Sequence, residues 1–67
     1  MTLTINGERK EFEEAELPLP ELLNQLGFGE RPVLVELNGT ALRQREHEET
    51  TIQDSDRLEI ILIVAGG

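Results

Sequence analysis

Few side chains in this sequence could carry out chemistry by themselves. The chain has no cysteine, one histidine (His47) and one serine (Ser55). It therefore has no thiolate nucleophile, and a single histidine cannot form a histidine metal cluster. His47 lies in the polar stretch Glu46–Glu49 with no nucleophile nearby, so we interpret it as a structural or exposed residue. Asp54 and Asp56 lack the remaining ligands of a calcium loop, and we predict a turn there. We expect no catalytic residue and no metal site.

The sequence given ends in four small or apolar residues, Val64, Ala65, Gly66 and Gly67. Glycine has no Cβ and can pass through an opening where other residues would clash. Four extended residues reach about 13–14 Å. We therefore expect residues 64–67 to form a flexible tail that can enter an enclosed site of another protein, attached to a folded domain of residues 1–63. A diglycine alone is a weak indication, because many flexible tails end in two glycines.

Length and charge restrict the function further. A chain of 67 residues is one small domain, too small for a deep cleft between domains. Fourteen acidic and six basic residues give a net charge of −8, which nucleic acid and anionic membranes would repel. The longest apolar run, Ile60–Ala65, is far too short to span a membrane. The start of the sequence lacks the features of a signal peptide, and the absence of cysteine fits a reducing compartment, so we expect a cytoplasmic protein.

The elements that must position the tail follow from periodicity. Thr2–Ile5 alternates polar and apolar residues, and Asn6-Gly7 favours a type I′ turn into a second strand, Glu8–Phe12. Residues 33–37 and 40–42 repeat this arrangement around Asn38-Gly39.

One helix is predicted between these hairpins. Its apolar stripe is followed by Gly27, which suits a C-terminal cap, whereas Pro18 offers no capping oxygen at the start. The stripe consists of Leu19, Leu22, Leu23 and Leu26.

The last strand, Arg57–Val64, is apolar on both faces, so it belongs in the middle of a sheet or against a partner. Gln44–Thr50 is predicted to be a loop or a single turn, and Thr51-Ile52 a brief bridge. The order strand, strand, helix, strand, strand, strand predicts an α+β fold of the β-grasp (ubiquitin-like) type. It has a mixed five-stranded sheet with one main helix packed on one face. A split βαβ fold and a small barrel are the alternatives.

Along its whole length, the sequence resembles the ThiS family, the sulfur carrier proteins of bacterial thiamine biosynthesis. Three positions depart from the family pattern and concern local geometry: Ser55 replaces a usual turn glycine, Arg43 a common proline, and Pro18 the hydroxyl cap of the helix. The segments that carry the resemblance are Thr4–Gly7, Leu22–Gly27, Val35–Gly39, Asp54–Ile60 and the final Gly66-Gly67.

The resemblance implies a carrier and not an enzyme. A partner of the ubiquitin-activating (adenylating) type would use ATP to adenylate the carboxylate of Gly67. Sulfur from a persulfide, made by a cysteine desulfurase, would then convert it to a thiocarboxylate. That group would donate sulfur to thiazole synthase, so the chain itself would bind no cofactor.

Docking to these partners should involve the body of the protein, because a loosely held tail loses entropy on binding. The candidate docking residues are Ile61, Ile63 and, if it is exposed, Leu34. They could equally pack the second face of the sheet. We expect a monomer when the chain is free.

Two other functions stay open at this point. The same fold with a terminal diglycine also suits the small subunit of molybdopterin synthase or another sulfur carrier. A ubiquitin-like modifier of lysines or a small interaction module is a more distant alternative.

Overall fold

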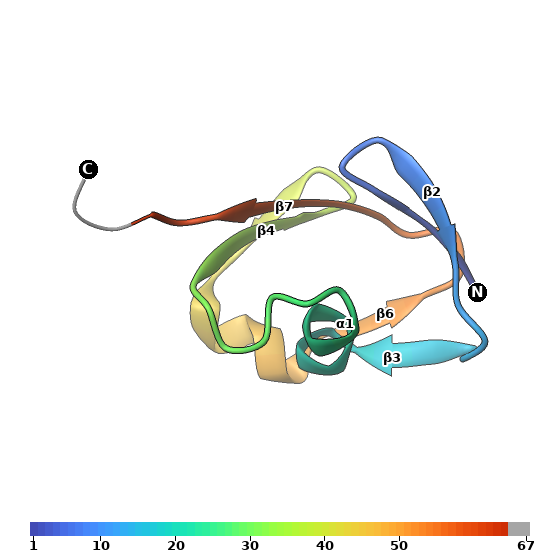
Figure 1. Cartoon of the computed structure of the whole chain (residues 1–67), viewed down its shortest axis with the longest axis horizontal. Coiled ribbons are helices and arrows are strands. Elements are labelled where there is room, and N and C mark those ends of the chain that lie inside the picture. The colour runs from blue at the N-terminus through green and yellow to red at the C-terminus, as the bar shows by residue number, and fades with distance from the viewer. Residues whose placement is uncertain (65–67) are drawn as a thin grey trace.

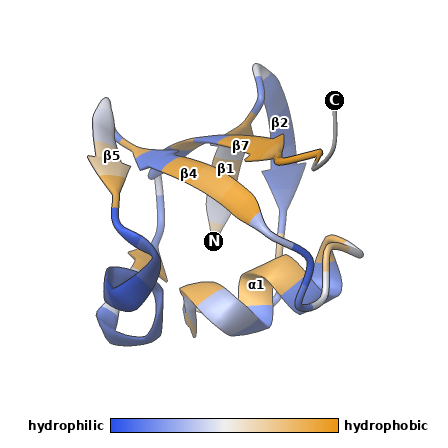
Figure 2. Ribbon diagram, turned by 90° about the vertical axis from the view of Figure 1, so that its left-hand side faces the viewer, coloured by the Kyte–Doolittle hydropathy of each residue, from blue (hydrophilic) through white to orange (hydrophobic). Residues whose placement is uncertain are grey.

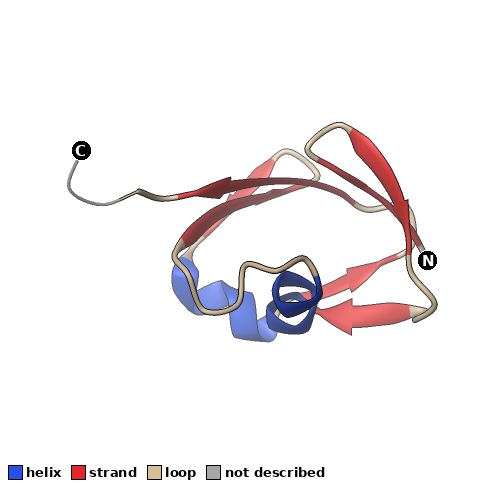
Figure 3. Cartoon of the chain, in the orientation of Figure 1, coloured by secondary structure: helices blue, strands red, loops and turns tan. Residues whose placement is uncertain are grey.

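The protein has two layers, seen in a computed structural model that describes residues 1–64 (Figures 1 and 3). A five-stranded sheet forms one layer, and two short helices with a two-stranded sheet form the other. In chain order the elements are β1 (Thr2–Ile5), β2 (Glu8–Glu11), β3 (Glu16–Pro18), α1 (Leu19–Gln25), β4 (Val33–Leu37), β5 (Thr40–Leu42), the 3₁₀ helix η1 (Gln44–Glu49), β6 (Thr51–Gln53) and β7 (Arg57–Leu62).

The large sheet has the strand order β2-β1-β7-β4-β5. The last strand, β7, is its centre, parallel to β1 and antiparallel to β4. The central position predicted from the two-faced apolar pattern of this strand is confirmed. With the helix on one face of a mixed sheet, the fold is the β-grasp fold.

Both Asn-Gly turns hold the central strand in place. Asn6 and Gly7 have φ values of 51° and 82°, and Asn38 and Gly39 have 51° and 87°, as the predicted type I′ turns require. Asn6 Nδ2 donates to the carbonyl oxygen of Ile60 (3.0 Å), and its Oδ1 accepts from the Ile60 N–H (2.7 Å). Asn38 Oδ1 likewise accepts from the N–H of β7 at its first residue (2.9 Å). The turn residues therefore fix β7 on both sides.

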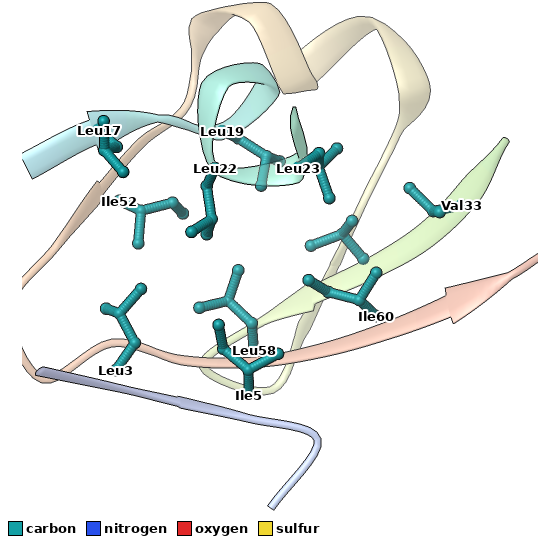
Figure 4. Close-up of a cluster of buried hydrophobic side chains, with 11 residues drawn as sticks. Leu3, Ile5, Leu17, Leu19, Leu22, Leu23, Val33, Ile52, Leu58 and Ile60 are labelled. Carbon is teal, nitrogen blue, oxygen red and sulfur yellow. The ribbon is translucent and has the colours of Figure 1, made fainter. Parts of the chain in front are cut away.

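The core lies between the two layers, and Figure 4 shows its side chains pointing toward one another from the large sheet and from the helix layer. The helix stripe supplies the centre of the core, as predicted. Leu26, Leu37, Leu42 and Leu62 pack at its margin. The buried residues are Leu3, Ile5, Leu17, Leu19, Leu22, Leu23, Val33, Val35, Ile52, Leu58 and Ile60.

The two ends of α1 are built differently. At the C-terminal end, Gly27 has φ 92°, its N–H donates to Asn24 O, and the Phe28 N–H donates to Leu23 O, which is a Schellman cap. At the N-terminal end Pro18 provides no side-chain cap, as predicted. Instead, the Leu19 N–H donates at 2.9 Å to the carbonyl oxygen of Thr50, the residue between η1 and β6, and this bond holds the start of the helix.

The sequence prediction is incomplete around residues 14–18 and 44–53. The structure contains a strand that was not predicted, β3, which pairs with β6 and buries Leu17 and Ile52. The loop or single turn expected at Gln44–Thr50 is a six-residue 3₁₀ helix. The strand predicted to run from Glu8 to Phe12 is one residue shorter, and the last strand ends at Leu62 instead of Val64.

The departures at Ser55 and Arg43 have local explanations. Ser55 adopts φ 74°, the left-handed region in which a glycine would be unstrained. Arg43 uses the N–H that a proline would lack, donating it to Glu46 Oε1 (2.7 Å) at the start of η1.

Candidate docking face and tail

The chain leaves the sheet from its central strand. The Ile63 N–H donates to the Pro32 carbonyl oxygen at 3.0 Å, one residue beyond β7. Val64, the first residue of the predicted tail, is 79% exposed and lies in no strand. The other predicted tail residues, Ala65, Gly66 and Gly67, lie outside the described residues. The boundary between a domain of residues 1–63 and a tail of residues 64–67 therefore stays a prediction.

The outer face of the large sheet carries an apolar patch beside this exit. Leu34 and Ile61 stand opposite each other across β4 and β7 and are 56% and 58% exposed. Ile63 lies two residues further along and is 43% exposed. Figure 2 shows hydrophobic residues along β4 and at the end of β7, in contrast to the hydrophilic η1. We call Leu34, Ile61 and Ile63 the outer apolar patch.

The sequence left the exposure of these residues open, and the structure shows that all three are exposed, whereas docking itself is a proposal. Burial alternates strictly along β4, with Val33 and Val35 inside and Leu34 outside. Within residues 1–64, no other element covers Leu34 or Ile61. An exposed cluster of large aliphatic side chains is typical of a surface that contacts another protein.

His47 is buried, at 5% exposure, on η1. It lines a groove of about 440 Å³, together with Arg31, Arg45, Glu48 and the apolar Leu23, and the groove contains no hydroxyl or thiol group. Nucleophilic catalysis needs a nucleophile within hydrogen-bond reach of the base, and none lines this groove. The Nε2 atom of His47 has no hydrogen-bond partner among residues 1–64. The geometry supports the structural interpretation of this residue.

The side chains of Asp54 and Asp56, in the 54–56 turn, accept hydrogen bonds from backbone N–H groups and from a side-chain amide. Asp54 Oδ1 accepts the Thr2 N–H at 2.7 Å, and this hydrogen bond holds the pKa of Asp54 below its usual value. Asp56 Oδ2 accepts the Gln53 N–H at 2.8 Å, and its Oδ1 accepts from Asn38 Nδ2 at 3.0 Å. The turn predicted here is confirmed. Residues 1–64 contain no group of three His, Cys, Asp or Glu residues placed to hold a metal ion.

Neither helix in the described part of the chain is long and apolar enough to cross a membrane.

Comparisons with known proteins agree over the whole chain. A thiamine biosynthesis protein (ThiS) from Geobacter metallireducens has a similar crystal structure, with a TM-score of 0.86, 35% identity and full coverage of both chains. A solution structure of a thiamine biosynthesis protein from the same organism has a TM-score of 0.80 and 36% identity, covering 100% of this chain and 88% of the other.

Two relatives differ in length. A protein named ycf40, described as uncharacterized, from Porphyra purpurea is 42% identical over 67 residues, which are 100% of this chain and 93% of the relative. A thiazole synthase from Paramagnetospirillum magneticum is 36% identical over 67 residues, which are 100% of this chain but 20% of that protein. The model of the ThiS family matches residues 3–67. The resemblance read from the sequence is therefore confirmed, and this chain belongs to the ThiS family.

Proposed function

We propose that this protein is a sulfur carrier in the thiazole branch of thiamine biosynthesis. The observation that carries the proposal is the family match over residues 3–67, which includes both terminal glycines. The full-length likeness to a thiamine biosynthesis protein supports it. The exposed residue Val64 after the central strand supports a role for the tail.

The proposed chemistry takes place at the carboxylate of Gly67. A carboxylate is a poor electrophile, and an activating enzyme overcomes this by joining it to AMP from ATP, with pyrophosphate as the leaving group. A persulfide sulfur then attacks the acyl carbon and displaces AMP. A thiol cleaves the resulting sulfur–sulfur bond, leaving a disulfide and the thiocarboxylate of Gly67. Because this chain has no cysteine, the partners supply both the persulfide and the thiol.

Thiazole synthase is the proposed acceptor of the sulfur. The relative from Paramagnetospirillum magneticum contains a 67-residue region similar to this whole chain within a protein named thiazole synthase. Such an arrangement holds a carrier and its acceptor at high effective concentration. The adenylating enzyme and the cysteine desulfurase complete the set of proposed partners. The cytoplasmic location and the monomeric state stay predictions.

In this proposal the body of the protein provides most of the affinity. The outer apolar patch docks on the partner enzyme, and residues 64–67, which follow the adjacent end of β7, reach the active site of that enzyme. In this proposal the partners supply the catalytic groups.

A genetic experiment tests the proposed pathway. Deleting the gene should produce a requirement for thiamine that the preformed thiazole also satisfies. The wild-type gene should restore growth, and a gene that lacks the codon for Gly67 should not, although the truncated protein melts at the wild-type temperature. Growth restored by the truncated gene, or a requirement for molybdopterin instead of thiamine, would contradict the proposal.

A further inference from the structure

Two carboxylates face each other in the middle of the exposed sheet surface. The register of β4 and β7 places Glu36 directly opposite Glu59, and both are exposed. The next pair on the same face is Leu34 opposite Ile61, two residues along the ladder and therefore about 7 Å away. Along β7 the outer face thus presents a carboxylate, then the outer apolar patch, and then the start of the tail.

The fold gains nothing from this pair of carboxylates. Like charges directly opposite each other on neighbouring strands are destabilising. Within residues 1–64 the structure contains one ion pair, Lys10 with Glu8, and no hydrogen bond to the side chain of Glu36 or Glu59. Arg57 is on the same face, two residues before Glu59, yet it does not form an ion pair with it. Among residues 1–64, Glu36 and Glu59 therefore have no basic partner, and they lie beside the exposed residues of the outer apolar patch.

A single basic side chain would satisfy both groups at once. The Cβ atoms of directly opposite residues on neighbouring strands are about 5 Å apart, so one guanidinium or ammonium group can lie between the two carboxylates. An arginine suits this geometry best, because its planar fork donates to two acceptors. The same contact would remove the repulsion within the pair, so it is more favourable than a contact with an isolated glutamate.

We propose that thiazole synthase docks on this face through an apolar contact with Leu34 and Ile61 and a basic side chain placed between Glu36 and Glu59. This inference rests on the proposed function and adds the chemistry of the partner surface. Thiazole synthase is the occupant because a region similar to this chain is part of a protein of that name. The contact fixes the orientation of the carrier, so that the tail, which leaves from the same strand, enters the active site.

The test compares two double variants that change the net charge equally. Glu36→Gln with Glu59→Gln removes the facing pair, and Glu13→Gln with Glu48→Gln removes two exposed carboxylates away from the outer face. Binding to the thiazole synthase of the same organism is measured by calorimetry, and stability by thermal melting. We expect the first variant to lose about tenfold or more in affinity and to melt at the same or a higher temperature. The control should lose less than about threefold.

Equal affinities of the two variants would overturn the inference, because the carboxylates would then act only through net charge. Sulfur loading by the activating enzyme, measured without thiazole synthase, separates this failure from that of the proposed function. Normal loading with equal affinities contradicts the docking inference alone. A wild-type chain that accepts no sulfur overturns the proposed function, and the docking inference with it.

Discussion

Two neighbouring residues of β7 show how one strand serves both the fold and its proposed partner. Ile60 is 4% exposed and packs in the core, whereas Ile61 is 58% exposed on the opposite face. Their side chains are identical, and only the two-residue period of the strand separates them. The inner face of the sheet is closed by the helix layer, whereas no other element of residues 1–64 covers Ile61 on the outer face. The face of the sheet on which an isoleucine lies, and not its residue type, therefore decides whether it contributes to stability or is available for binding.

The largest expected effect is on the inner face. Ile60→Ala and Leu22→Ala would each leave a cavity in a small core and lower the free energy of unfolding by about 2–5 kcal/mol. Because a domain of this size has a total stability of roughly 5 kcal/mol, either variant should be largely or partly unfolded at room temperature. Urea unfolding followed by circular dichroism measures the change.

Ile61→Ala is the matched control for the inner face. Since Ile61 is exposed, its truncation should change the free energy of unfolding by less than about 0.5 kcal/mol. If Ile60→Ala and Ile61→Ala destabilised the protein equally, the division of the strand into a structural face and a binding face would be wrong.

The second effect concerns binding to the activating enzyme. Ile61→Asp should fold normally but place an unpaired charge in an apolar contact, which raises the dissociation rate. Thr51→Asp, at an exposed strand position in the other layer, makes the same change in charge and should leave dissociation unchanged. Both rates can be measured by surface plasmon resonance.

Added salt should act mainly on the rate of association with the activating enzyme. With a net charge of −8, the chain should be steered toward a basic partner surface, and such steering is screened over about 8 Å at physiological salt. Added salt should therefore slow association much more than it speeds dissociation. Association that is insensitive to salt would leave the acidic surface with a role in solubility alone.

A smaller effect is expected at the 54–56 turn, which belongs to neither face. Ser55→Gly should raise the free energy of unfolding by about 0.5–1 kcal/mol, because glycine adopts positive φ without strain. Gly39→Ser is the reverse change at φ 87°, where an added Cβ has no atom within 4 Å, so that backbone strain alone should destabilise it. Thermal melting compares the two, and destabilisation by Ser55→Gly would show that the serine is needed for the turn.

The smallest effect is the pH dependence at Asp54. Because the Thr2 N–H lowers the pKa of this carboxylate in the folded state, its contribution to stability is present above the unfolded pKa of about 4 and is lost as the pH falls through the folded value. The stability difference between wild type and Asp54→Asn should therefore be constant from neutral pH down to about pH 5 and shrink below about pH 4. Glu13→Gln is the control for the loss of one negative charge. A stability difference that grew as the pH fell would contradict a lowered pKa of Asp54 in the folded state.

Periodicity and turn chemistry were sufficient to predict most of the fold. The Asn-Gly turns, the leucine stripe and the two-faced last strand each act locally, so that their residues alone indicate the element. The strand β3 could not be predicted in this way, because its partner β6 lies more than 30 residues away and only the pairing of the two strands defines it. The 3₁₀ helix η1 depends on the Glu46 side chain bonding back to the Arg43 N–H, a contact that composition does not reveal.

The candidate site was only partly predictable. Alternation placed Leu34 and Ile61 on an outer face, but their register, and that of Glu36 with Glu59, depends on how two distant strands align. The importance of Gly67 came from the family resemblance, since glycine has no side chain that could signal chemistry.

The mass of the intact protein, isolated from cells growing without thiamine, tests the central claim most directly. Wild-type protein should contain a fraction in which one oxygen is exchanged for sulfur, and fragmentation should place that exchange at Gly67. A variant without Gly67 should show no such fraction. A terminus joined to a lysine of another protein, or a terminus that stays unmodified whatever the sulfur supply, would contradict the account.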